Sequence, residues 1–155
     1  MNRILLKSLI VLGCLLSLFG KQLYADQAKF KIEVINPGTN RQTVDMSVVF
    51  IDYRVTNMTG VTRTLTRVLQ NSVAQDPNCM FSPALAANAC QNVFTLQPGQ
   101  SCNLCMQFFA NKPGRYTGGP AICKVAVDLR SPDPFLCSQP TVADQLDITV
   151  VSSLP

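Results

Sequence analysis

Six cysteines between residues 79 and 137 constrain the fold of this chain more than any other feature. An oxidising compartment would pair them as three disulfides, and fifteen connectivities are open to six cysteines. Each closed loop would add about 3 kcal/mol, so three bridges rival the net stability of a typical domain. The sequence therefore predicts a small disulfide-stapled domain. Its cysteines are Cys79, Cys90, Cys102, Cys105, Cys123 and Cys137.

The N-terminus predicts export into such a compartment. Arg3 precedes an apolar stretch over residues 4–19, in which Lys7 is the only charge. Ala25 then supplies the small residue that a signal peptidase requires just before the cut. We therefore expect residues 1–25 to be a signal peptide.

Removal of this segment before Asp26 would leave residues 26–155 as the mature protein, which is the usual length of one domain. We expect it in the periplasm or the medium, with no stable membrane span after cleavage. A lipoprotein anchored at Cys14 is the alternative, because residues 11–14 loosely match the box that precedes a lipidated bacterial cysteine.

The net charge gives no sign of a nucleic-acid partner. The chain has 13 basic and 9 acidic residues, but Arg3, Lys7 and Lys21 lie in the predicted signal peptide. The remaining chain has ten basic and nine acidic residues, which gives a net charge of about +1, and it contains no run of basic residues. The expected partner is an unknown protein or surface ligand.

The spacing of Cys102 and Cys105 has three interpretations. A redox site needs the first cysteine at a helix N-terminus, yet residues 105–110 alternate as a strand does. A zinc site needs further close ligands, but Cys79 and Cys90 are far apart and the chain has no histidine. We expect structural disulfides, no metal and no cofactor; a thiol–disulfide redox protein is a remote alternative.

Alternating apolar side chains separated by proline and glycine turns predict an antiparallel β-sandwich. In one segment the alternation slips between Phe50 and Ile51, which predicts either a β-bulge near Val49 or a strand buried on both faces. The predicted strands cover residues 29–36, 44–55, 61–70, 94–96, 102–110, 122–129 and 146–150.

Three segments are less regular. Residues 61–70 also fit a helical face, although their threonines favour a strand. Residues 71–92 and 130–142 are expected to be loops, the first with a helical turn around residues 84–89. Residues 57–59 form a glycosylation sequon, which we interpret as a turn.

The chain resembles the immunoglobulin-like sandwich modules of the choice-of-anchor and PapD-like superfamily. The resemblance rests on residues 53–57, a strand ending in Val-Thr-Asn, on the Leu-x-Pro-Gly-x-Ser-Cys turn within residues 90–102, and on Pro113-Gly114. Residues 118–123 and 137–146 are similar to uncharacterised exported proteins of intracellular Gram-negative bacteria. Together these matches cover roughly residues 28–150.

The resemblance implies an exported all-β protein, an antiparallel immunoglobulin-like β-sandwich of about seven disulfide-stabilised strands, and brings no catalytic residues. Cys79 and Cys105 look like additions to the family pattern. The resemblance and proximity in the sequence together imply that Cys90 pairs with Cys102 and Cys123 with Cys137, which leaves Cys79 for Cys105.

A binding or surface-interaction module is the function that this sequence favours. Enzymes that use histidine in a triad or dyad are excluded, because the chain has none, and the carboxylates are scattered along it. Phe81 and Phe135, in the loops 71–92 and 130–142, are the candidate contact residues, or else apolar plugs under those loops. A periplasmic assembly factor or chaperone that offers a strand edge is the alternative.

Overall fold

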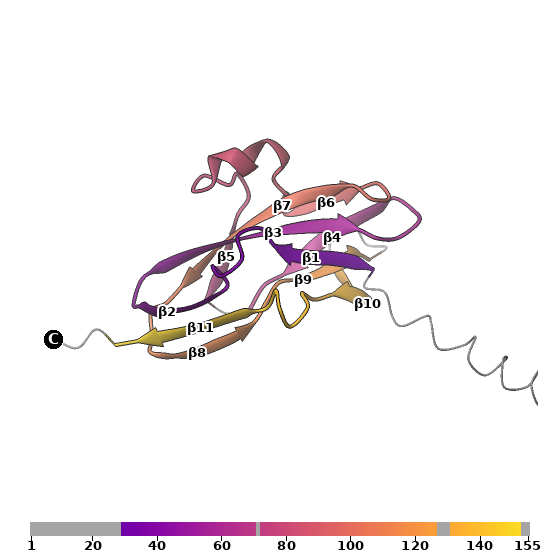
Figure 1. The fold of residues 1–155 in the computed structure, drawn as a ribbon. Coiled ribbons are helices and arrows are strands. Elements are labelled where there is room, and N and C mark those ends of the chain that lie inside the picture. The colour runs from indigo at the N-terminus through magenta and orange to yellow at the C-terminus, as the bar shows by residue number, and fades with distance from the viewer. Residues whose placement is uncertain (1–28, 71, 127–130, 153–155) are drawn as a thin grey trace, which may run out of the picture.

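A computed structural model gives the structure of the protein and describes residues 29–70, 72–126 and 131–152 (Figure 1). The predicted signal peptide and Cys14 lie outside these residues. No helix in the described ranges is long and apolar enough to span a bilayer. Their elements are β1 Phe30–Val34, β2 Arg41–Asp45, β3 Val48–Asn57, β4 Arg63–Val68, β5 Val73–Asp76, the 3-10 helix η1 Pro83–Asn88, β6 Val93–Leu96, β7 Ser101–Phe109, β8 Gly114–Gly118, β9 Ala121–Val125, β10 Pro132–Ser138 and β11 Leu146–Val151.

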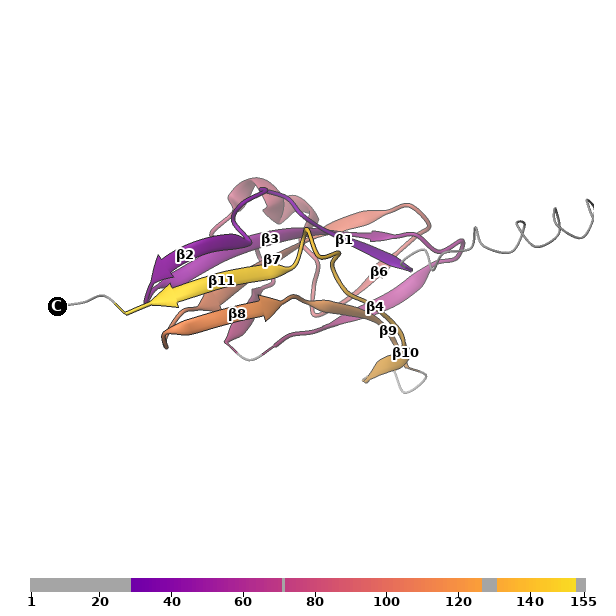
Figure 2. The same cartoon turned by 60° about the horizontal axis from the view of Figure 1, so that its bottom comes forward.

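The strands form two layers. Four antiparallel strands in the order β1-β3-β7-β5 make the first layer, which we call sheet A. The second layer contains the sheets β10-β9-β4-β6 and β2-β11-β8, which follow one another because β8 leads into β9 through residues 119–120. Figure 2 shows β2, β11 and β8 side by side at one end, with β9 and β10 at the other. This arrangement confirms the immunoglobulin-like β-sandwich, whose strand pairs among the described residues are antiparallel except for the parallel pair β2–β11.

The core lies between these layers. Ile32, Tyr53 and Leu104 from sheet A meet Leu65 and Ile148 from the second layer, and each is at most 2% exposed. Burial of each such side chain stabilises the fold by about 1.5–3 kcal/mol. The alternating apolar residues of the sequence therefore lie on the inner faces of the two layers, where they pack against each other.

Tyr116 fixes one corner of the sandwich. Its hydroxyl donates a 3.0 Å hydrogen bond to the carbonyl of Lys112, and its ring packs edge-on against Phe108 with centroids 4.9 Å apart. Tyr116 therefore ties the turn before β8 to the core of the sandwich.

The structure has more strand segments than expected, because three short strands lie in segments predicted to be loops or turns and the predicted strand 44–55 is divided between β2 and β3. β5 lies within residues 71–92, β8 precedes the Gly118-Gly119-Pro120 turn, and β10 lies within residues 130–142. β10 carries two prolines and pairs irregularly with β9, as an edge strand can. The strand interpretation of residues 61–70 and the helical turn near residues 84–89 are confirmed by β4 and η1.

The predicted β-bulge near Val49 is wrong. The register of β3 with β7 runs without a break from Val48 opposite Phe109 to Thr56 opposite Ser101. The alternation slips because Val44 belongs to β2 in the other layer, while Phe50 lies on the outer face of sheet A and is 39% exposed. The slip therefore marks a change of layer followed by apolar side chains that face outward.

Asn57, the asparagine of the sequon, is fully buried and ties two turns together. Its side-chain amide donates to the carbonyls of Val61 and Leu96, each at 2.9 Å, and its oxygen accepts from the backbone N–H and hydroxyl of Thr59. The structure thus agrees with the interpretation of this segment as a turn, since a buried amide is inaccessible to a glycosyl donor in the folded protein.

Asn57→Ala should destabilise the protein by about 2–4 kcal/mol, because four hydrogen bonds are lost and the carbonyl of Leu96 loses the side-chain donor that it has in the wild type. Urea denaturation measures this loss. Asn36→Ala is the matched control: Asn36 is exposed, so its substitution should change stability by less than about 0.5 kcal/mol. Equal losses in both variants would contradict the role given to Asn57.

Candidate interaction site

Three disulfides are formed: Cys79–Cys105, Cys90–Cys102 and Cys123–Cys137. These are the pairs expected from the resemblance and proximity. Cys123 and Cys137 lie directly opposite each other in the β9–β10 pair, so this bond fastens the edge strand β10 to the second layer.

The other two disulfides involve cysteines on opposite faces of β7. Cys102 points into the core, as do Leu104 and Met106, whereas Cys105 lies on the outer face of sheet A. Both cysteines are at most 5% exposed, and each is bonded to a different partner. They do not form a dithiol pair, so the structure gives the redox alternative no support. In the described part of the chain, no three His, Cys, Asp or Glu side chains converge as metal ligands would.

A loop of residues 77–92, which we call the cover loop, crosses the outer face of sheet A (Figure 1). The Cys79–Cys105 bond attaches it at one point, with Cys79 in the left-handed region at φ 48°. Asn103 of β7 donates to the carbonyl of Leu85 at 3.2 Å, and Asn88 donates to that of Ser101 at 2.9 Å. Covalent and polar contacts therefore hold the loop in one position.

The cover loop places Phe81 against the sheet, where it completes a continuous apolar surface. The rings of Phe81 and Phe50 stack with centroids 4.5 Å apart. Val48 follows on the same face and lies opposite Phe109 on β7, and Met46 stands at the turn before β3. We call these five residues the apolar patch. Their side chains are 36–57% exposed, so a contiguous group of large apolar residues faces solvent, as at protein interaction sites.

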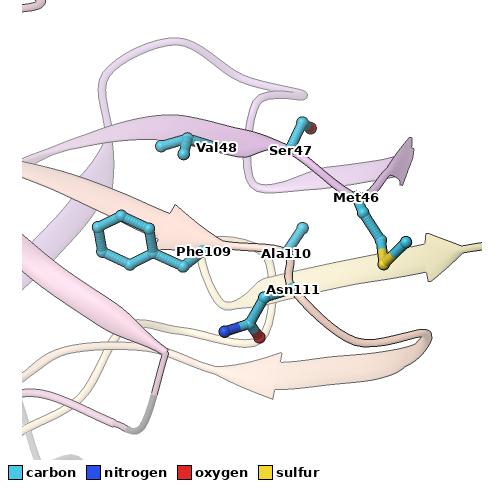
Figure 3. Close-up of a pocket in the computed structure, with 6 residues that line it drawn as sticks. All are labelled: Met46, Ser47, Val48, Phe109, Ala110 and Asn111. Carbon is cyan, nitrogen blue, oxygen red and sulfur yellow. The ribbon is translucent and has the colours of Figure 1, made fainter.

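One end of the apolar patch is hollowed. Figure 3 shows Val48, the first residue of β3, with Met46 and Ser47 before it, beside Phe109, the last residue of β7, with Ala110 and Asn111 after it. These residues line an open groove of about 450 Å³. The N–H of Ala110 donates to the carbonyl of Ser47 at 2.8 Å, which fixes the two walls relative to each other. A side chain of a partner has room to enter here.

Two carboxylates lie beneath the cover loop. Asp52 on β3 and Asp76 on β5 flank Cys105 of β7, each as its direct cross-strand neighbour. Asp52 is 6% exposed and accepts a 2.7 Å hydrogen bond from the hydroxyl of Ser82. Burial raises the pKa of Asp52 above its ordinary 3.8, the bond from Ser82 opposes that rise, and the charge of Asp76 adds to it.

Asp76 accepts backbone N–H groups from the loop, those of Asn78 at 3.2 Å and Phe81 at 3.3 Å. Asp76 therefore positions the very residue that completes the apolar patch. The fold thus brings together Asp52 and Asp76, two of the carboxylates that are scattered along the sequence. No residue pattern indicated this pair, because 24 positions separate the two aspartates.

The second contact candidate, Phe135, lies elsewhere. It stands on β10 in the second layer, is 88% exposed, and its backbone N–H is held by Asp133 at 3.1 Å. The structure therefore does not bring Phe81 and Phe135 together. Sequence reasoning missed the neighbours of Phe81, namely Phe50 and Val48, although the slip in their alternation was the signal that could have found them.

No protein-family model and no curated protein matches this chain. Among solved structures, it is similar to a protein of unknown function from Porphyromonas gingivalis W83 (14% identity, TM-score 0.48, 80% of this chain and 49% of that one). It is also similar to the cupredoxin domain of amoB from Nitrosocaldus yellowstonii (16% identity, TM-score 0.41, 66% of this chain and 55% of that one). A third similar structure is SSP-19, an MSP-domain-like protein of Caenorhabditis elegans (10% identity, TM-score 0.40, 72% of this chain and 94% of that one). The chain spans about half the length of the first two. At these scores the likenesses carry no functional argument.

A double-mutant cycle tests the aromatic stack. Phe50→Ala and Phe81→Ala should show a coupling free energy of about 0.5–1.5 kcal/mol, because each ring loses its partner when the other is removed. Chemical denaturation of the two single variants and the double variant measures it. The cycle of Phe81 with the distant Phe135 is the control and should be additive within about 0.5 kcal/mol. Additivity in both cycles would show that the stack is absent in solution.

Proposed function

We propose that this protein is an exported, non-enzymatic module that binds a protein or surface ligand through its apolar patch. The observation that carries this proposal is the solvent-exposed stack of Phe50 and Phe81 beside the groove at Met46. Clustered aromatic side chains next to a recess are typical of the residues that dominate binding energy at protein interfaces.

The frame around the patch supports this proposal. Phe81 lies within two residues of the Cys79–Cys105 disulfide, and Phe50 belongs to a strand that is paired along its whole length with β7. Residues already held in one conformation lose little entropy when a ligand binds. Three disulfides also indicate an oxidising compartment, which agrees with the expected cleavage before Asp26 and a location in the periplasm or the medium.

Several observations support a non-enzymatic role. The chain has no histidine, so neither serine nor cysteine has the usual activating base. Asp52 and Asp76 lie under the cover loop rather than in an open cleft, and the groove at Met46 is lined by apolar side chains, one amide and the hydroxyl of Ser47. Membership of the choice-of-anchor and PapD-like superfamily would suit this role, since its modules present binding surfaces on a rigid sandwich.

A second candidate function is that of an assembly factor or chaperone that offers a strand edge. One observation favours it: β3 continues beyond the end of β1. β1 pairs with β3 from Asn57 to Tyr53, and Ile35 adds one bond to Asp52, so the edge of β3 from Val48 to Ile51 has no strand beside it among the described residues. An extended peptide could pair there.

Selection of peptides from a displayed library on the exported protein tests the main proposal. We expect the enriched peptides to carry aromatic or aliphatic side chains and to lose about tenfold or more in affinity on Phe81→Ala, which corresponds to about 1.4 kcal/mol. Phe135→Ala is the matched control, an exposed phenylalanine outside the patch, and should leave the affinity unchanged. Peptides that are insensitive to Phe81→Ala and weakened by Phe135→Ala would move the binding site to β10.

A further inference from the structure

The cover loop encloses acidic groups and supplies nothing to neutralise them. From residue 77 to residue 111 the chain contains no Lys, Arg, Asp or Glu. The loop therefore places only a neutral hydroxyl, that of Ser82, against the carboxylate of Asp52. A buried carboxylate is ordinarily paired with a cation or with several donors, because the loss of hydration is costly.

The strands packed around Asp52 do not provide a cation either. On β7 the outward-facing neighbours are Cys105, in a disulfide, and the uncharged Asn103 and Gln107. On β5 the neighbour is Asp76, which has the same sign of charge. Asp52 therefore has a like charge two strands away on one side.

Along β3 the basic residue next to Asp52 is Arg54, and no ion pair between the two is formed in the described part of the chain. Arg54, two residues along β3, is exposed and lines a polar hollow with Glu33, which lies opposite it on β1. Glu33 in turn pairs with Lys31 at 2.7 Å. These charges belong to the β1 edge of sheet A, so the charge of Asp52 is left to be relieved by a proton.

We propose that uptake of a proton by Asp52 tightens the cover loop over sheet A, so that the Phe81 end of the apolar patch is better ordered in acidic than in neutral medium. Protonation removes a buried charge and its repulsion with Asp76, while the carboxyl can still accept the hydroxyl of Ser82. The loop then covers one buried carboxylate charge, that of Asp76, instead of two. The benefit to ligand binding rests on the proposed function; the tightening itself does not.

The sign of the pH dependence follows from the direction of the shift. The pKa of Asp52 is raised in the folded protein, so the folded state holds more protons than the unfolded state between the ordinary value of 3.8 and the raised value. Stability of the loop therefore increases as the pH falls through the raised pKa. The gain is complete below 3.8, where both states are protonated.

Hydrogen exchange of the exported protein tests this inference without any ligand. Asp52→Asn mimics the protonated carboxyl, so at about pH 7.5 its cover-loop amides should exchange more slowly than those of the wild type. Below pH 3.8 the two proteins should exchange alike, and comparison at equal pH cancels the intrinsic pH dependence of exchange. Asp45→Asn, at an exposed aspartate of β2, is the matched control and should match the wild type at both pH values.

Equal exchange of Asp52→Asn and the wild type at neutral pH, or faster exchange in the variant, would overturn the inference. So would slower exchange of the wild type on addition of Ca²⁺ alone, since a metal ion rather than a proton would then neutralise the pair. If the variant does not fold, NMR titration of the wild type tests the inference instead. The chemical shifts of the Asp52 carboxyl carbon and of the Phe81 amide should then change over the same pH range, above the ordinary aspartate pKa of 3.8. If the cover loop shows the expected pH dependence but the peptide selection yields no binder, the proposed function is refuted and the inference about Asp52 stands.

Discussion

The alternation of side chains along β7 is the constraint on which the rest of this structure depends. Because Cys102 and Cys105 are three residues apart in a strand, one points into the core and the other outward, and each forms its own disulfide. The inner bond closes the turn through β6, and the outer bond fastens the cover loop to the exposed face of sheet A. In the chain-entropy model each contributes about 3–4 kcal/mol, so the long excursion between β5 and β6 is held without a core of its own.

The outer bond has a consequence for the surface of the protein. It brings Phe81 to Phe50 and so joins the loop to the apolar side chains that run along β3 to the groove at Met46. The same attachment closes the loop over Asp52 and Asp76. Stability alone would favour a cation or an apolar side chain there, so the buried carboxylates without a cation and the exposed aromatic rings both depart from what stability favours, as functional features often do.

The fold was largely predictable from the sequence, and the site was only partly so. Apolar alternation and proline–glycine turns are local signals, and they correctly indicated most strands and the sandwich. β10 escaped prediction because its prolines oppose strand pairing, which an edge position tolerates. The apolar patch joins segments far apart in the chain: Phe81 was a candidate as an apolar residue in a loop, but its contact with Phe50 depends on the Cys79–Cys105 bond. The Asp52–Asp76 pair depends on strand order, which residue periodicity does not encode.

Peptide mapping of the exported protein under non-reducing conditions tests the central claim most directly, namely that β7 sends one disulfide to each face of sheet A. The account predicts one peptide pair linked through Cys79 and Cys105 and another linked through Cys90 and Cys102. A peptide in which Cys102 is bonded to Cys105 would contradict it, because alternate facing in a strand keeps their Cβ atoms well beyond the roughly 4 Å that a disulfide requires. In that case neither the strand assignment nor the position of the cover loop would hold.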